Sequence, residues 1–292
     1  MSELTLQKLA VFGVGLIGGS FAAALRSAGV VQRVAGVGRS RGNLEHAAAL
    51  GLIDEIADDA AAALDGADLA LVAVPVQQTE AVLRQIAAHA GPSCVITDAG
   101  STKQDVVAAA RRAFGPGIIR FVPAHPIAGA ELSGAQAASA TLYRDRLAVL
   151  TPLPETEPRA CALVEALWRA CGARPVRMTP QRHDEVFAAV SHLPHALAFA
   201  LAHMLAGRPD AQQLFGFAGA GFRDFTRIAG SSPEMWRDIC LANRDALGAE
   251  IAAFQRALEA LAAHLERGDA QAIERMFEAA RAARSRWLPG VE

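Results

Sequence analysis

The amino-acid sequence predicts an α/β fold, with a doubly wound parallel sheet at the N-terminal end and an all-helical domain after it. Apolar segments of strand length alternate with helical segments between residues 9 and 178, the pattern of parallel strands joined by helices. The segment 67–74 is almost continuously apolar, as expected of a strand that is buried on both faces. Beyond residue 179 the strand pattern stops and long segments rich in alanine and leucine follow.

The first predicted strand, residues 9–12, leads into Gly-Val-Gly-Leu-Ile-Gly at residues 13–18, and a helix is expected over 21–28. The spacing is the G-x-G-x-x-G pattern of dinucleotide-binding folds. The first glycine permits a tight turn, the second admits a pyrophosphate, and the third lets the helix pack on the strand. The helix N-terminus then faces the phosphates. The residues assigned to the cofactor in this turn are Gly13, Gly15, Leu16, Ile17 and Gly18.

The second predicted strand, residues 33–38, ends where such folds place the ribose of the cofactor. An acidic residue about twenty positions beyond the glycine turn binds the ribose hydroxyls in NAD enzymes. Here that position is Gly38, followed by Arg39, Ser40 and Arg41. Cations and a hydroxyl suit a ribose 2′-phosphate, so NADP is favoured over NAD, with Arg39 and Ser40 as its contacts. The alternative is a solvated loop that happens to carry two arginines.

The remaining elements follow in order. Helices are expected over residues 44–50 and 79–90, and strands over 67–74, 93–98, 118–123, 147–151 and 173–178. Val74 and Pro75, at the end of the apolar strand, are also assigned to the cofactor. The domain boundary is placed between residues 178 and 179, giving a dinucleotide-binding domain (1–178) and a helical substrate and dimerisation domain (179–292). Helices are expected over 181–206, 233–265 and 269–286, with Gly268 and Asp269 capping the last two.

Composition narrows the partners. The 292 residues are 52% hydrophobic and 20% charged, and the net charge of −2 comes without a basic stripe. Nucleic acid and anionic membranes are therefore not expected as partners. The charge-free stretch 186–207 contains three histidines and a proline, which favours a buried helix over a membrane span. The four cysteines lack metal-binding spacing and are expected to be buried thiols. The first residues show no signal-peptide features. We expect a cytoplasmic protein.

Two polar stretches follow predicted strands of the sheet. Ser101 lies in Asp-Ala-Gly-Ser-Thr-Lys at residues 98–103, where it is expected to cap a helix with Gln104 as its capping-box partner, or to contact a substrate, or both. His125 lies between Pro123 and Pro126 after a strand end. It is either a general base that titrates near neutral pH or a histidine in a surface loop.

The helical domain carries two more candidate stretches. Ser191, His192 and His195 surround Pro194, which should kink the helix. His192 can also be a hydrogen-bonded core histidine, and no third ligand supports a metal site. Arg227 is the candidate to bind a carboxylate, because its planar fork matches carboxylate geometry. The alternative is a surface ion pair with Asp224.

Together these stretches resemble the prephenate/arogenate dehydrogenases of tyrosine biosynthesis. The shared motifs are G-x-G-L-I-G-G-S (13–20), D-x-G-S-x-K (98–103), H-P-x-A-G (125–129), S-H-x-x-H (191–195), F-x-D-x-T-R-I-A (222–229) and the following Met-Trp. The resemblance implies oxidative decarboxylation of prephenate or arogenate by hydride transfer to NADP or NAD, giving 4-hydroxyphenylpyruvate or tyrosine. It implies His125 as the base and Ser101 as its catalytic neighbour. It implies substrate-binding roles for His195, Arg227, Trp236, Ser191 and a gating Glu131.

Two other interpretations stay open. One is a dehydrogenase of the hydroxyacid or 6-phosphogluconate type, although residues 179–292 contain no lysine to act as its catalytic group. The other is a non-catalytic, nucleotide-sensing dimer. A homodimer is expected, because large apolar residues at spacings of three and four form a seam along the helix near residues 244–265. These residues are Leu247, Ile251, Phe254, Leu258, Leu261 and Leu265. The alternative is that this seam packs only within its own chain.

Overall fold

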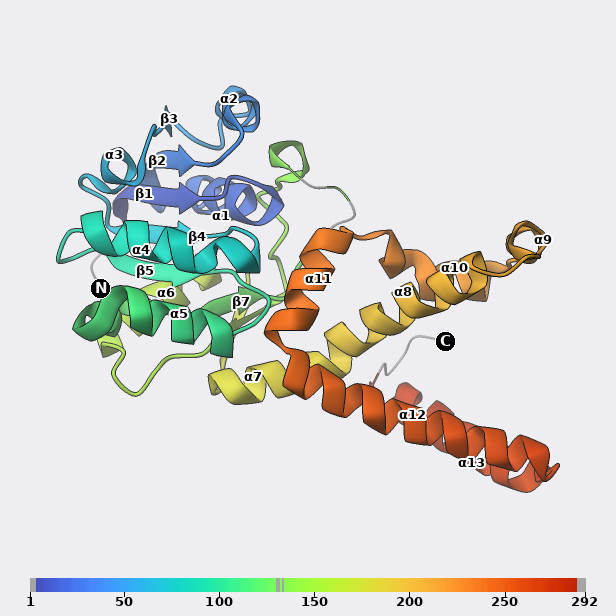
Figure 1. Ribbon diagram of the computed structural model, residues 1–292. Coiled ribbons are helices and arrows are strands. Elements are labelled where there is room, and N and C mark those ends of the chain that lie inside the picture. The colour runs from blue at the N-terminus through green and yellow to red at the C-terminus, as the bar shows by residue number, and fades with distance from the viewer. Residues whose placement is uncertain (1–3, 130–131, 133, 288–292) are drawn as a thin grey trace. The chain divides into compact units, whose positions relative to one another are not determined.

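The computed structural model describes residues 4–129, 132 and 134–287 (Figure 1). A six-stranded parallel sheet has the strand order β3-β2-β1-β4-β5-β6. Its strands are β1 (Leu6–Phe12), β2 (Val31–Val37), β3 (Glu55–Ile56), β4 (Leu69–Val72), β5 (Val95–Asp98) and β6 (Phe121–Val122). The order reverses between β1 and β4, and ligands of such sheets bind at the carboxyl ends of the strands at this point. The predicted doubly wound sheet is thus confirmed.

The central strands β1, β4 and β5 bury side chains on both of their faces. Along β1, Leu9 and Val11 belong to one hydrophobic core, whereas Ala10 and Phe12 belong to another. The first core includes residues of α1 (Leu16–Ser27), α2 (Arg41–Ala49) and α6 (Pro158–Ala170). The second includes residues of α3 (Ala60–Leu64), α4 (Thr79–His89) and α5 (Gln104–Phe114), and Figure 1 shows α4 and α5 along this face. The free cysteines 94, 161 and 171 are buried in these cores as expected, and Cys240 is half-buried.

A second, three-stranded sheet has the order β7-β8-β9. It consists of β7 (Ala124–Pro126), β8 (Leu147–Leu150) and β9 (Arg174–Arg177), with β7 antiparallel and β9 parallel to β8. The prediction of a single sheet was therefore wrong for its last strands. Residues 118–123 are a 3₁₀ turn followed by the short β6, after which the chain leaves the large sheet. His125 consequently lies in strand β7, not in a surface loop.

A series of helices follows the second sheet. They are α7 (Pro180–Phe187), a π-helical turn (Ala188–His192), α8 (Leu193–Ala206), α9 (Ala211–Gly216), α10 (Ala220–Thr226), a 3₁₀ turn (Arg227–Gly230) and α11 (Pro233–Ala242). The irregularity predicted at Pro194 takes the form of the π turn immediately before it. The predicted helix 233–265 is interrupted at Asn243.

The expectation that residues 186–207 are buried was wrong for the chain by itself. Pro180–Ala206 is long and apolar enough to cross a membrane by length and composition alone, and only 22% of its most apolar window is buried. Within α8 the buried residue is Ala198. Apolar surface on this helix therefore remains uncovered within the single chain.

The structure divides into two compact units, Met1–Arg244 and Asp245–Glu292. The second unit contains most of α12 (Arg244–Glu266) and all of α13 (Ala270–Trp287). Between these helices Gly268 has φ +63°, and the Asp269 carboxylate accepts a hydrogen bond from the Ala272 N–H at 3.0 Å. Both predicted caps are confirmed. The predicted domain boundary between residues 178 and 179 lies inside the first unit and stays a prediction.

Candidate active site

The glycine turn between β1 and α1 forms a cradle that fits a pyrophosphate. Gly13 has φ +98°, and a Cβ there would lie 2.4 Å from the Ala73 carbonyl oxygen. A Cβ on Gly18 would lie 2.2 Å from the Gly13 carbonyl oxygen, whereas a Cβ on Gly15 would meet no atom of the described chain within 4 Å. Within that part of the chain, no side chain caps the N-terminus of α1. Open space beside uncapped N–H groups suits a phosphate.

The end of β4 borders this cradle. Val74 follows the strand, and its Cγ1 atom lies 3.0 Å from the position that a Gly13 Cβ would take. Pro75, the next residue, is exposed and precedes a short 3₁₀ turn. Since β1 and β4 flank the reversal in strand order, Val74 and Pro75 lie where a dinucleotide would cross the sheet.

The end of β2 presents cations and no acid at the predicted ribose site. Gly38 and Arg39 are exposed, and the Ser40 hydroxyl caps α2 by accepting a hydrogen bond from the Asn43 N–H at 3.2 Å. Arg41 pairs with two carboxylates, those of Glu45 and Asp58. In the described part of the chain Arg39 has no hydrogen-bond or ion-pair partner, so its guanidinium is available to a ligand.

A buried ion pair connects the end of β5 to β7. Lys103 and Asp98 are almost fully buried and form a direct ion pair. The other carboxylate oxygen of Asp98 accepts a hydrogen bond from the Ala124 N–H at 3.0 Å, and the Lys103 ammonium donates to the Ala124 carbonyl at 2.8 Å. Ala124 immediately precedes His125, so this pair fixes the backbone that carries the candidate base. Both residues lie in the D-x-G-S-x-K motif, but the motif alone did not indicate this role.

The predicted cap at Ser101 was wrong. Helix α5 begins at Gln104, and the carboxylate of Asp184 caps it. Its Oδ1 accepts from the Lys103 N–H at 2.8 Å and its Oδ2 from the Gln104 N–H at 2.9 Å. A distant carboxylate thus takes the place of the local hydroxyl. Ser101 is half-buried in the segment between the ion-paired Asp98 and Lys103.

His125 is half-buried and its ring is surrounded by other rings. Its Nδ1 lies 2.8 Å from Nε2 of His183, and its ring packs edge-to-face on Phe187 at 4.9 Å. Burial, together with the nearby charges of His183, Lys103 and His192, holds the pKa of His125 well below its ordinary value. The ring is therefore neutral at neutral pH and able to accept a proton.

The partners of His125 were not foreseen, because no sequence motif marked them. The buried His183 places its Nδ1 2.8 Å from Oδ1 of Asp184. Burial lowers the pKa of His183. Burial raises the pKa of Asp184, but hydrogen bonds from His183 and from the first N–H groups of α5 outweigh it and hold that pKa below its usual range.

His192 is a hydrogen-bonded core histidine, one of the two interpretations that the sequence left open. The Asn243 side-chain amide donates to Nδ1 of His192 at 3.1 Å and to the Asp184 carbonyl at 2.8 Å. Burial lowers the pKa of His192 to about 4. The side chain of Asn243, at the end of α11, therefore connects this neutral histidine of the π-helical turn to Asp184 of α7.

His195, Trp236 and Arg227 form a second cluster. The His195 ring stacks on Trp236 with centroids 3.6 Å apart, and its Nδ1 lies 2.9 Å from the Ser191 carbonyl oxygen. Burial and the positive charge of the exposed Arg227 both lower the pKa of His195. Trp236 also contacts His192, with ring centroids 6.1 Å apart, which connects this cluster to that of His125.

The structure thus brings His125, His195, Trp236 and Arg227 into one connected region. Glu131 lies outside the described residues. Within residues 4–129, 132 and 134–287, no group of three His, Cys, Asp or Glu side chains is placed to hold a metal ion. The glycine turn at the carboxyl end of β1 fits a dinucleotide, and β7 carries a neutral histidine. Together they define a nicotinamide-dependent dehydrogenase.

Comparison with known proteins identifies the family. The model of the prephenate dehydrogenase nucleotide-binding domain matches residues 21–177, and that of the prephenate dehydrogenase dimerization domain matches residues 179–279. The chain belongs to the prephenate dehydrogenase family.

Individual relatives agree with this assignment. The chain is 37% identical to the prephenate dehydrogenase of Bacillus subtilis over 92% of its length and 73% of the relative. It is 36% identical to the cyclohexadienyl dehydrogenase of Zymomonas mobilis, covering 82% of each chain. Among solved structures, prephenate dehydrogenase from A. aeolicus in complex with hydroxyphenyl propionate and NAD+ superimposes with a TM-score of 0.92 at 34% identity, covering 98% of this chain and 99% of that one.

Proposed function

We propose that this chain oxidatively decarboxylates prephenate, arogenate or both in tyrosine biosynthesis. The observation that carries the proposal is His125, a neutral ring held on β7 next to the sheet whose glycine turn fits a dinucleotide. The names of the relatives support this class of substrate. Production of 4-hydroxyphenylpyruvate from prephenate or of tyrosine from arogenate, with one reduced nicotinamide formed per turnover, tests it directly.

His125 supplies the proton chemistry of this reaction. It accepts the proton of the substrate's ring hydroxyl, and the electron pair left on oxygen forms a carbonyl as hydride leaves the same carbon. A nicotinamide dinucleotide held at the glycine turn of residues 13–18 would supply the acceptor for that hydride. The bond to the ring carboxylate then breaks, carbon dioxide leaves, and its electron pair makes the ring aromatic, after which His125 returns the proton to the phenolate. Placing a base and holding the substrate carboxylates are the main tasks of the protein.

The other predicted site residues take binding roles in this proposal. Ser101 lies next to the residues that fix His125 and binds the ring hydroxyl. His195, with Nδ1 engaged by the Ser191 carbonyl, presents Nε2 to the substrate. Arg227 binds a carboxylate, and Trp236 forms the wall on which His195 stacks. The gating role of Glu131 stays a proposal from the family resemblance.

The preferred cofactor is proposed to be NADP. Replacing Arg39 with alanine is expected to raise KM for NADP roughly tenfold to a hundredfold, as for a lost hydrogen bond to a charged group worth about 1.5–3 kcal/mol. KM for NAD should hardly change. Arg84→Ala is the matched control, since Arg84 is exposed on α4 and bonded to Glu80. Steady-state rates with both cofactors measure the effect, and a wild-type preference for NAD would contradict the proposal.

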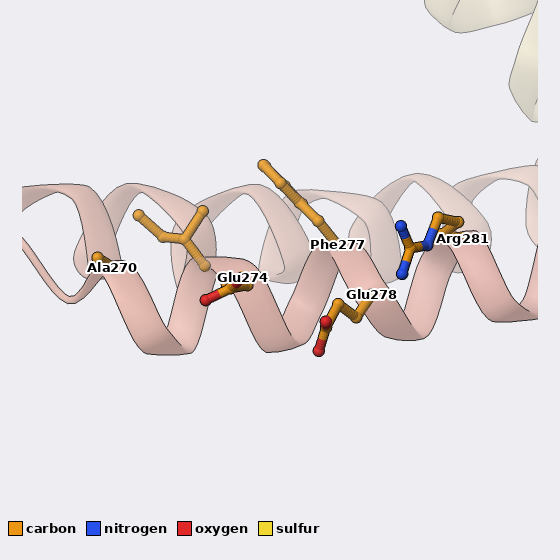
Figure 2. Close-up of a pocket in the computed structure, with 6 residues that line it drawn as sticks. Ala270, Glu274, Phe277, Glu278 and Arg281 are labelled. Carbon is orange, nitrogen blue, oxygen red and sulfur yellow. The ribbon is translucent and has the colours of Figure 1, made fainter.

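A homodimer joined through the helices is proposed as the working form. Two apolar surfaces support it: the weakly buried α8 and the seam of α12, where Leu258 is 51% and Leu265 62% exposed. On α13, Phe277 is 55% exposed and lines an open groove with charged neighbours on the same helix (Figure 2). Exposed apolar surface of this extent marks an interface between chains.

The double replacement Phe254→Asp and Leu258→Asp is expected to give monomeric or insoluble protein, because two charges would enter an apolar interface. Gln255→Asp, on an exposed position of the same helix between the two, is the control. Sedimentation velocity measures the outcome. A wild-type species of 30.5 kDa at micromolar concentration would refute the dimer.

A further inference from the structure

We infer that Asp184 and His183 form a hydrogen-bond relay that holds His125 in the one tautomer able to act as a base. Asp184 and His183 are positioning residues, because they act through His125. The inference rests on the proposed function for its catalytic meaning. The relay itself can be observed without any substrate.

The direction of the relay follows from which atoms can donate. The Asp184 carboxylate is ionised and only accepts, so the Nδ1 of His183, 2.8 Å away, must carry a proton. His183 is neutral, so its Nε2 has a lone pair and can only accept. The Nδ1 of His125, 2.8 Å from that lone pair, must therefore be the donor. The remaining nitrogen of His125, Nε2, is left unprotonated and basic.

Backbone donors prevent the relay from reversing. Oδ1 of Asp184, which binds His183, also accepts from the Lys103 N–H, and Oδ2 accepts from the Gln104 N–H. Backbone N–H groups cannot become acceptors, so this side chain must keep two accepting oxygens. Asn243 holds the Asp184 carbonyl from the other side at 2.8 Å. Asp184, the first residue of the relay, is thus fixed in position and remains a hydrogen-bond acceptor.

The charged and titratable groups around His125 favour the same state. His183 faces its Nδ1, and Lys103 and His192 are the other groups that lower the pKa of the ring, Lys103 as a standing positive charge and His192 when it is protonated. All of these disfavour a second proton on His125, but none of them selects the nitrogen that carries the first. An isolated neutral imidazole carries its proton mainly on Nε2, which would leave no base for the substrate. Selection of Nδ1–H requires an acceptor at that side, and the hydrogen bond made by one ring nitrogen sets the state of the other. In this chain the acceptor is His183.

The first test measures the tautomer in the wild-type protein. Nitrogen-15 NMR of protein labelled on histidine distinguishes a protonated from an unprotonated ring nitrogen, and the signals lost in His125→Asn assign the ring. The expected result is a proton on Nδ1 and a lone pair on Nε2 at neutral pH. A His125 ring with its proton on Nε2 would overturn the relay, whatever the activity of the enzyme.

The second test compares two replacements of the same residue. In His183→Gln the side-chain oxygen can still accept from Nδ1 of His125, whereas His183→Leu fills the space without an acceptor. We expect His183→Leu to shift the His125 proton toward Nε2 and to lower kcat roughly 10- to 100-fold, less than the loss of about 10²–10⁴-fold expected when the base itself is removed. His183→Gln should keep most of the Nδ1-protonated tautomer of His125 and most of kcat. KM for the cofactor should stay unchanged in both variants.

These results separate the relay from the proposed function. Equal kcat and equal tautomers in the two variants would overturn the relay while leaving His125 as the base. A wild-type enzyme that turns over neither prephenate nor arogenate would refute the proposed function, yet the NMR result would still decide the relay. If His183→Leu does not fold, the tautomer of the wild-type ring and of His183→Gln remains decisive.

Discussion

Replacement of His125 with asparagine is expected to lower kcat by about 10²- to 10⁴-fold, the usual contribution of a positioned general base. Asparagine can still donate a hydrogen bond to Nε2 of His183, but it lacks the ring that packs on Phe187 and it cannot take up a proton. Steady-state formation of the reduced nicotinamide measures the loss. Binding of the reduced cofactor, followed by its fluorescence, should be unchanged, and undiminished turnover would contradict the assignment of His125.

The same residue sets the acid side of the wild-type pH profile. The pKa of His125 lies well below its ordinary value of 6.5, so the neutral, active form persists below that pH. As the pH falls through the lowered pKa, the ring becomes protonated and kcat/KM declines. The decline should therefore begin at a lower pH than for an unperturbed histidine, and it should be absent from the residual activity of His125→Asn.

Removal of Arg227 is expected to have the second largest effect. Arg227→Ala should weaken substrate binding by about 2–5 kcal/mol, as when one partner of a desolvated charge pair is lost, or roughly 30- to several-thousand-fold. The substrate carboxylate would then enter the site without its counter-ion. His195 already senses the positive charge of Arg227, which places the guanidinium close to the stacked histidine.

Two controls separate the binding role of Arg227 from a general effect of charge. Arg227→Lys should recover only part of the affinity, because an ammonium lacks the two parallel donors of the guanidinium. Arg208→Ala should be neutral, since Arg208 is exposed and bonded to Asp210 at the surface. KM for the substrate and Kd for the cofactor are measured for each. A KM unchanged in Arg227→Ala would show that Arg227 is a surface residue with no part in binding.

The features that sequence predicted well are those encoded by neighbouring residues. The glycine turn at 13–18 was predicted because its tight φ and close contacts depend on local residue type. The cap at Asp269 and the irregularity before Pro194 have the same local origin. The absence of an acid after β2 was equally visible, because the ribose position lies at a fixed distance along the chain from the glycine turn.

The features that were missed depend on contacts between distant segments. The cap of α5 comes from Asp184, 81 residues beyond Lys103, so the nearby Ser101 pattern predicted the wrong hydrogen-bond acceptor for the start of this helix. His183 carried no signal in the sequence, since a histidine in the polar stretch 181–186 looks like a solvated residue. The burial of α8 was overestimated because an apolar helix can be covered by its own chain or by another.

Asp184 has a consequence for how the enzyme can open and close. Its carboxylate and carbonyl join the start of α5, helix α7 and the residue that ends α11, through hydrogen bonds to Lys103, Gln104 and Asn243. Each such bond contributes about 0.5–3 kcal/mol, so hinge motion through this joint would be costly. Among the described residues, helices α9 and α10, where most side chains are exposed, contribute no hydrogen bond to this joint. Substitutions in α9 or α10 are therefore expected to leave the alignment of the base unchanged.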